Sequence, residues 1–281
     1  MASSSFKKSF FRGFRDIRFT FSISMILIFF ICAIFAQQLA LQDPELIFLD
    51  QRLQFPNLKH PFGCDVFGRD LFTLILYGAQ QTFIIVLTSV TLSTLIGVIA
   101  GTLAGYFGGI VEIIIMRTVD ILMAFPGILL SMALASFLGP SVYNLILAIT
   151  ATGWTATARL SRAQVLSIKE REHVVAVNSL GASNLRILTH HILPFLWTPL
   201  FVSSTFSLSG VILTEASLSF LGLGANSSIP TWGGLLFQGR NVLEEAPFLS
   251  LIPGVLIATL ILSFNFIGDI LRDIFDPKLK T

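Results

Sequence analysis

Charged residues are scarce in this sequence. Aspartate, glutamate, lysine and arginine make up 12% of its 281 residues, whereas hydrophobic residues make up 54%. A soluble domain has about 25% charged residues, so the composition excludes a soluble fold and predicts an all-α integral membrane protein. The formal net charge of +2 is too small to indicate a nucleic-acid partner, and we expect none.

Cysteine is almost absent, with two residues in the whole chain. Cys32 lies in an apolar stretch and Cys64 lies outside one, so we expect no internal disulfide. No small-residue cleavage site follows the first apolar stretch. This stretch is therefore predicted to stay in the membrane as an anchor.

Motifs that bind nucleotides or metals are also missing. No glycine is followed by lysine anywhere in the chain, so it lacks the glycine-rich phosphate loop that holds ATP in many ATPases. The histidines do not have the spacing of a metal-binding helix; they are His60, His173, His190 and His191. We therefore expect no cofactor, no metal and no catalytic residue, and the chain is predicted not to be an enzyme.

An intramembrane protease would need paired acids, and Asp120 and Asp269 lie near the ends of two apolar stretches. Such proteases carry a Gly-x-Gly-Asp motif, but here the four residues ending at Asp269 are Phe-Ile-Gly-Asp. Arg117 and Arg272 each lie three positions from one of these acids. This spacing favours ion pairs at the membrane surface over a shared proton.

Long stretches without charge predict six membrane-spanning helices, because about 20 apolar residues cross a bilayer. The uncharged stretches are residues 19–42, 71–111 and 121–158, and two further apolar stretches lie at about Phe195–Thr214 and Ala246–Gly268. Gly139-Pro140 divides residues 121–158 into two spans, the third and fourth.

The second and third spans need further interpretation. Residues 71–111 are too many for one membrane-spanning helix, so we expect the second span to begin near Gln80-Gln81 and to end at residues 105–109. In the third span, Pro126-Gly127 is expected to kink the helix, because proline removes a backbone hydrogen bond.

Basic residues are distributed unevenly about the spans. With six spans both termini lie on one side, which carries 14 basic residues against 4 on the other. Cytoplasmic loops are rich in lysine and arginine, so both termini and residues 169–194 are predicted to be cytoplasmic. No ionisable residue lies near the middle of a span, and Glu215 lies at the outer end of the fifth, which argues against an ion-driven secondary carrier.

The segment Lys169–Pro194, which we call the elbow, is the main polar interruption between apolar stretches. Its sequence predicts a helix with apolar positions at Val174, Val175, Val177 and Leu180. The break at 181–183 is followed by a second short helix, which is expected to stop before Pro194. Two small helices at an angle form a shape that another protein can bind in a groove. The alternative is an ordinary inter-helix loop.

Three glycines recur every four residues in the second span, at Gly97, Gly101 and Gly105. This spacing places all three on one face of a helix. Glycine at such a face lets a neighbouring backbone approach closely, so we expect close helix packing there.

Several motifs of the chain resemble those of permeases of ATP-binding cassette (ABC) importers, and in particular the C-type permease subunit of dipeptide, oligopeptide and nickel importers. The stretches that carry the resemblance are HPFGCDVFGRD at 60–70, GYFGG at 105–109, MRTVDILMAFP at 116–126, TGWTATARLSR at 152–162, LGAS at 180–183, HILP at 191–194, TEASLSFLGLG at 214–224, PTWG at 230–233 and FNFIGDILRDIFDPKL at 264–279. The resemblance runs from about residue 60 to the C-terminus.

The resemblance implies a MetI-like fold and a set of partners. These are a homologous second permease, two cytoplasmic ATPase subunits, an extracytoplasmic substrate-binding protein, a peptide substrate and the lipid of a bacterial inner membrane. It also implies that the elbow couples the permease to the ATPases, through Glu172, Val174, Val175, Ala176, Val177, Leu180, Gly181, Ala182, Ser183, Leu193 and Pro194. The family loop usually begins Glu-Ala-Ala, and this chain instead has Val175-Ala176-Val177, so the usual acid is missing.

Together these features predict a multi-pass permease subunit of an ATP-driven peptide importer. Residues 1–70 are expected to hold a cytoplasmic tail, the first span and an outer loop, and residues 71–281 the permease domain. The alternatives are a permease for nickel or another small solute in the same family, and, from another class, a stand-alone channel or secondary carrier.

Overall fold

The computed structural model describes residues 17–225 and 228–275, and within them the chain is helical and forms no strand. Its elements in chain order are α2 (Ile17–Ile34), α3 (Ala36–Leu39), η1 (Leu49–Gln51), α4 (Leu71–Phe107), α5 (Gly109–Met123), α6 (Gly127–Leu138), α7 (Val142–Lys169), α8 (Glu172–Ser179), α9 (Asn184–Arg186), η2 (Ile187–Ile192), α10 (Leu193–Phe220), α11 (Trp232–Gly239), η3 (Arg240–Val242) and α12 (Phe248–Phe275).

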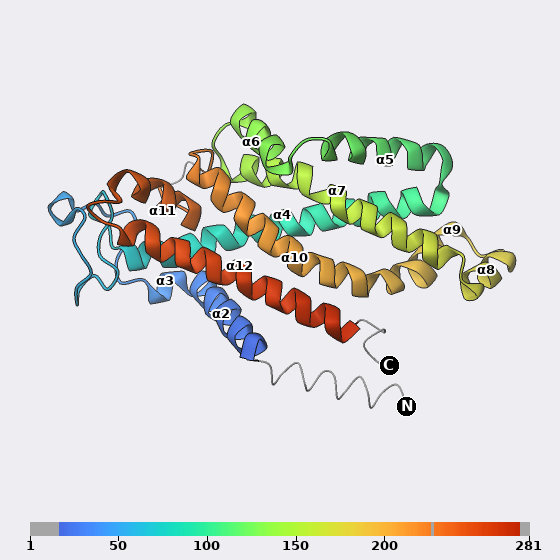
Figure 1. Cartoon of the computed structure of the whole chain (residues 1–281), viewed down its shortest axis with the longest axis horizontal. Helices are drawn as coiled ribbons and strands as arrows, with labels where there is room; N and C mark the ends of the chain where they lie inside the picture. Colours follow the sequence, from blue (N-terminus) through green and yellow to red (C-terminus); the bar gives the residue numbers. More distant parts are fainter. Residues whose placement is uncertain (1–16, 226–227, 276–281) are drawn as a thin grey trace.

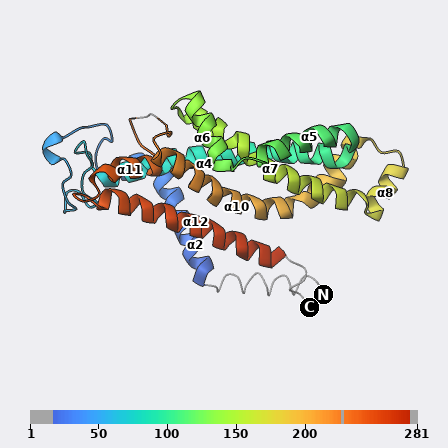
Figure 2. The same ribbon diagram turned by 45° about the horizontal axis from the view of Figure 1, so that its top comes forward.

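The long helices run side by side along one axis of the molecule (Figures 1 and 2). In the described part, α2, α4, α12 and the continuous helical stretch 184–220 are each long and apolar enough to cross a membrane. The bent pair α5–α6 gives a fifth candidate. α7 equals α10 and α12 in length, at 28 residues, but is less apolar. Counting α7 as a span as well gives six, which is consistent with the sequence prediction.

The helix of the second span starts at Leu71, before the expected position near Gln80-Gln81, and ends at Phe107, within the expected range 105–109. α4 is a single helix of 37 residues that continues through Gln80 and Gln81. Asp70 caps its first turn, because its carboxylate accepts a hydrogen bond from the Thr73 amide at 2.8 Å, and Gly108 with φ 65° ends it. At 1.5 Å per residue α4 is about 55 Å long, so it extends well beyond the hydrocarbon core of a bilayer.

The kink expected at Pro126-Gly127 is a complete break between two helices. α5 ends at Met123, α6 begins at Gly127, and their axes differ by 89°. Pro126 precedes the first residue of α6 and has an extended backbone, with φ −56° and ψ 120°. Proline has no amide hydrogen to donate, so the helical ladder is interrupted here and the chain changes direction.

The buried apolar side chains form two clusters. The larger one joins α2, α4, α7, α10, α11 and α12, and Phe29, Phe83 and Trp232 meet edge to face within it. The Trp232 indole also donates a hydrogen bond to the Ile75 carbonyl at 2.9 Å, which fixes α11 on α4. The smaller cluster joins α7, α8, η2 and α10.

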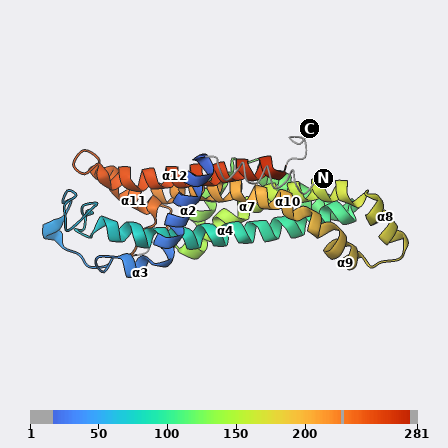
Figure 3. The same cartoon turned by 90° about the horizontal axis from the view of Figure 1, so that it is seen from below.

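The two ends of the molecule differ. α8 and α9 lie at one end, and α11 lies at the other with the segment between α3 and α4 (Figures 1 and 3). The first residues of α2 and the last residues of α12 both point toward the α8 end. We call the α11 end the outer end and the α8 end the elbow end.

The loop of residues 60–70 at the outer end is held by buried polar side chains. Asp65 accepts hydrogen bonds from the Phe67 and Arg69 amides at 2.8 and 2.9 Å, and its carboxylate forms an ion pair with Arg69 at 2.7 Å. The His60 ring nitrogen Nδ1 lies 3.0 Å from Asp70, and both side chains are buried. Because each acid also binds backbone amides, this loop has a fixed shape.

Candidate functional site: the elbow and the helices behind it

The elbow contains the helix that the sequence predicts at Val174–Leu180, and α8 covers Glu172–Ser179. It ends in a Schellman motif, since the Gly181 amide donates to the Asn178 carbonyl and the Ala182 amide donates to the Val177 carbonyl. Gly181 has φ +80°, a left-handed conformation that glycine adopts without steric cost. The angle of the elbow is therefore set at Gly181.

The second half of the elbow differs from the prediction. Ser183 caps a short helix at Asn184–Arg186, and its side chain accepts a hydrogen bond from the Arg186 amide. A π-helical turn, Ile187–Ile192, then leads directly into α10. The expected stop before Pro194 is wrong, because the π-helical turn continues into α10 and Pro194 is the second residue of α10.

The apolar side chains of α8 face two different ways. Val174 is 3% exposed and belongs to the smaller buried cluster, where it joins α7, η2 and α10, and Val177 is partly buried against the same cluster. Val175 is 50% exposed and Leu180 is 87% exposed. Ala176 is exposed as well. Thus one face of α8 holds it onto the protein, and the other presents apolar side chains to the surroundings.

A groove of about 500 Å³ lies beside α8, between α8 and the end of α4. Tyr106, Lys169, Val175 and Asn184 are among the residues that line it. The Lys169 ammonium donates to the Gly105 carbonyl at 3.1 Å, and the Tyr106 hydroxyl donates to the Asn184 side chain at 3.0 Å. These two contacts fasten the elbow to α4. Sequence reasoning did not identify Tyr106, and no signal in the sequence alone links it to Asn184.

The glycine face of α4 lies against α7. A Cβ added at Gly101 would lie 2.2 Å from the Ala158 carbonyl oxygen, and one at Gly97 would lie 2.7 Å from the Trp154 carbonyl oxygen. At Gly105 the Arg162 carbonyl oxygen would be 2.9 Å away. The close neighbour of this face is thus α7, a helix of the same chain.

The ion pairs near the elbow end also join different elements from those expected. Asp120 pairs with Arg159 of α7 at 2.9 Å, not with Arg117 on its own helix. Glu112 of α5 pairs with Arg162 of α7. Both contacts fasten α5 to α7, the helix that also packs on the glycine face. Arg159 and Arg162 lie in the second half of α7, which ends in the elbow at Lys169. The two ion pairs therefore link α5 to the elbow end of α7.

Comparison with known proteins places these features in a family. The family model described as "Binding-protein-dependent transport system inner membrane component" matches residues 93–281. The dipeptide transport system permease protein DppC of Alkalihalophilus pseudofirmus is 41% identical to this chain, over 90% of the chain and 83% of that protein. The glutathione transport system permease protein GsiD of Escherichia coli O6:K15:H31 is 38% identical, over 96% of the chain and 90% of that protein.

The fold also has a solved counterpart. The structure described as inward-facing conformations of the MetNI methionine ABC transporter contains a chain that superimposes with a TM-score of 0.60 and 20% sequence identity. The match covers 73% of this chain and 98% of that one. From its family model and its curated relatives, this chain belongs to the family of binding-protein-dependent transport system inner membrane components.

Proposed function

We propose that the chain is the membrane permease subunit of an ATP-driven importer of di- or oligopeptides. The names of its relatives support a peptide cargo, since they include dipeptide, D,D-dipeptide and glutathione transport permeases. In this proposal the chain works with a homologous second permease, two cytoplasmic ATPases and an extracytoplasmic binding protein. In this proposal the subunit lies in the inner membrane with both termini in the cytoplasm, which the uneven distribution of basic residues supports.

The observation that carries this proposal is that α8 has one buried apolar face and one exposed apolar face. A free apolar surface on a short helix at one end of a membrane protein suits a groove in a soluble partner. Val175 and Leu180 supply that surface here, because they are exposed while Val174 is already buried within the chain. Burying two such side chains contributes about 3 kcal/mol before the costs of association are subtracted. Contact with the ATPase then depends on apolar packing, in agreement with the missing family acid at Val175.

The other proposed coupling residues position this surface. Gly181 sets the angle between α8 and the next segment, and Ser183 starts that segment as its cap. Ala182 packs against the buried cluster, and Leu193-Pro194 joins the elbow to α10. A push on α8 is thereby transmitted to α7 and α10, two of the long helices of the membrane domain.

The experiment uses the complex of both permeases and both ATPases reconstituted in lipid. Val175→Asp places a charge in an apolar contact, so we expect reduced co-purification of the ATPases and loss of stimulation of ATP hydrolysis by loaded binding protein. Thr118→Asp adds the same charge at an exposed position of α5 and serves as the control. If Val175→Asp retains full ATPase association, α8 does not bind the ATPase. If the wild-type chain transports alone, it is a channel or carrier, and a nickel preference would identify the alternative cargo.

A second pair of variants separates binding from transmission. Gly181→Val forces a β-branched residue into a left-handed conformation, whereas Gly181→Asn introduces a residue that tolerates it. We expect Gly181→Val to keep the subunit in the membrane but to uncouple transport from ATP hydrolysis, with Gly181→Asn close to wild type. Full coupling in Gly181→Val would mean that the elbow is only a tether.

A further inference from the structure

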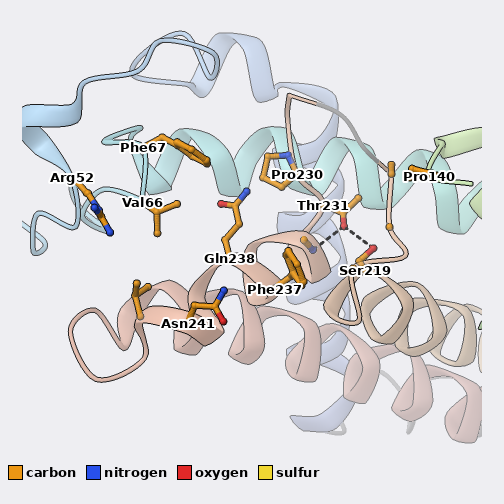
Figure 4. Close-up of a pocket in the computed structure, with 15 residues that line it drawn as sticks. Arg52, Val66, Phe67, Pro140, Ser219, Pro230, Thr231, Phe237, Gln238 and Asn241 are labelled. Atoms are coloured by element: carbon orange, nitrogen blue, oxygen red, sulfur yellow. Dashed lines mark hydrogen bonds between the residues drawn. The ribbon is translucent and has the colours of Figure 1, made fainter. Parts of the chain in front are cut away.

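Three of the sequence motifs that lie outside the elbow contribute residues to a single cavity at the outer end. The cavity has a volume of about 630 Å³, within the usual range for sites that hold small molecules. Val66 and Phe67 come from the 60–70 motif, Ser219 from the 214–224 motif, and Pro230 and Thr231 from the 230–233 motif (Figure 4). Residues remote in the sequence therefore build one concave surface.

The walls of this cavity are held by hydrogen bonds. Phe67 is held by its amide hydrogen bond to Asp65, and Arg69 donates to the Ser228 carbonyl at 2.8 Å. The second contact ties the 60–70 loop to the segment that leads into α11. A preformed wall of this kind lowers the ordering cost of binding a ligand.

One end of the cavity leads to a buried carboxylate. The Thr231 hydroxyl donates to the Ser219 hydroxyl at 3.3 Å, and Ser219 donates to Glu215 Oε1 at 2.8 Å. Glu215 is 1% exposed, and its other oxygen, Oε2, has no hydrogen-bond partner. No cation in residues 17–225 or 228–275 forms an ion pair with it. Ser219 lines the cavity, so a positive group placed there is one hydrogen bond away from this carboxylate.

The other end of the cavity is positive. In the view of Figure 4, Arg52 lies on the opposite side from Ser219 and Thr231. Arg52 is exposed, and no carboxylate of the described residues pairs with it. Between the two ends, the Gln238 side chain extends into the cavity, and its Oε1 is buried without a donor.

We propose that this cavity binds a short peptide by its two charged termini, as a site on the permease itself. The ammonium group donates to Ser219 and Thr231 in front of Glu215, and the carboxylate group pairs with Arg52. A peptide N–H group donates to Gln238, and apolar side chains lie against Phe67 and Phe237. This inference rests on the proposed function and extends it, because it gives the subunit direct contact with the cargo at the outer end.

The test measures binding of defined peptides to the reconstituted permease–ATPase complex without binding protein, by isothermal titration calorimetry. The probes are dialanine, N-acetyl-dialanine, which lacks the ammonium group, and dialanine amide, which lacks the carboxylate. We expect saturable binding of dialanine and a loss of about tenfold or more for each blocked probe, because each loses a charge-assisted contact. Equal binding of all three probes, or no saturable binding of dialanine, overturns the proposal.

Variants locate the binding in this cavity. Glu215→Gln should abolish the preference for dialanine over N-acetyl-dialanine, and Arg52→Gln should abolish the preference over dialanine amide. Glu244→Gln and Lys59→Gln remove exposed charges at the outer end without touching the cavity, and both should keep the two preferences. If these preferences survive Glu215→Gln and Arg52→Gln in protein that folds, the peptide binds elsewhere.

Two further measurements separate this proposal from its alternatives. Retention of the ATPases is recorded in the same samples, so a complex that assembles normally but binds no peptide refutes only the cavity and leaves the proposed function intact. If binding protein without peptide instead shields Gln238→Cys from a maleimide and dialanine does not, the cavity receives a loop of that protein, and the proposal fails.

Discussion

At the scale of single residues, Asp70 shows how one side chain fixes a long helix and the loop before it. One carboxylate oxygen caps α4 through the Thr73 amide, and the other lies 3.0 Å from the buried His60 ring. Asp65 acts in the same way on Phe67 and Arg69. The 60–70 motif therefore needs its acids to shape a loop, and no catalytic role is required to explain them.

The pH dependence of the Cys64 thiol tests whether the 60–70 loop is closed to solvent. The thiol is buried, and its pKa is raised to about 11, mainly by burial and also by the nearby Asp70 and Asp65, while Lys59 opposes the rise. The folded state favours the neutral thiol over the thiolate. Its contribution to the free energy of unfolding is therefore fully present below the ordinary pKa of 9.0 and is lost as the pH rises toward 11.

We expect alkylation of Cys64 by iodoacetamide to rise with pH about a midpoint near 11 in the folded protein and near 9.0 after unfolding. The measurement uses a Cys32→Ala background, in which Cys64 is the only cysteine. Lys59→Gln should move the folded midpoint upward, since it removes the cation that lowers the pKa. A folded midpoint near 9.0 would show that the loop is open to solvent.

At the scale of elements, the sequence predicted where the helices occur better than it predicted which surfaces of the helices are packed. Proline and glycine marked the break before α6 and the turn after α8, because these residues change the backbone locally. The start of α4 was expected near Gln80-Gln81 and lies at Leu71, because bilayer thickness limits only the part of a helix inside the membrane. Which face of α8 is buried could not be predicted, since Val174 and Val175 are equally apolar and only the packing of α7 and α10 distinguishes them.

The glycine face of α4 predicts a contrast between two matched substitutions. Gly101→Ala places a Cβ against the Ala158 carbonyl, so the helices must move apart, at a cost of about 1–3 kcal/mol. Gly210→Ala adds the same atom inside α10 where nothing lies within 4 Å, and alanine favours a helix by about 0.5–1 kcal/mol over glycine.

Thermal unfolding of the purified subunit in detergent measures both variants. We expect a lower midpoint for Gly101→Ala and an unchanged or higher midpoint for Gly210→Ala. Because α7 belongs to the same chain, the loss should be present without any partner subunit. Equal midpoints for the two variants would mean that α4 and α7 do not pack at this distance.

At the scale of the whole molecule, the two ends divide the work between them. The elbow end presents α8 on a base of buried valine, isoleucine and leucine side chains, and the outer end presents a cavity with fixed walls. α10 joins the two ends, because η2 leads into its first residue and Ser219 and Glu215 lie in its last turns. A helix between the proposed coupling surface and the proposed binding cavity is an arrangement that can transmit a displacement over the width of a membrane.

The last prediction tests whether the two ends lie on opposite sides of the membrane. The positive-inside rule predicts a cytoplasmic elbow, because the loops on the opposite side carry four of the 18 basic residues. Leu58 and Leu180 are both highly exposed, at 105% and 87%, so cysteines at these positions should react equally once the reagent can reach them.

In a background with Cys32→Ala and Cys64→Ser, a membrane-impermeant maleimide should label Leu58→Cys in intact right-side-out vesicles. Leu180→Cys should be labelled only after the vesicles are permeabilised. Labelling of Leu180→Cys in intact vesicles would place α8 outside the cell, where no ATPase subunit can reach it, and the coupling proposal would fail with it.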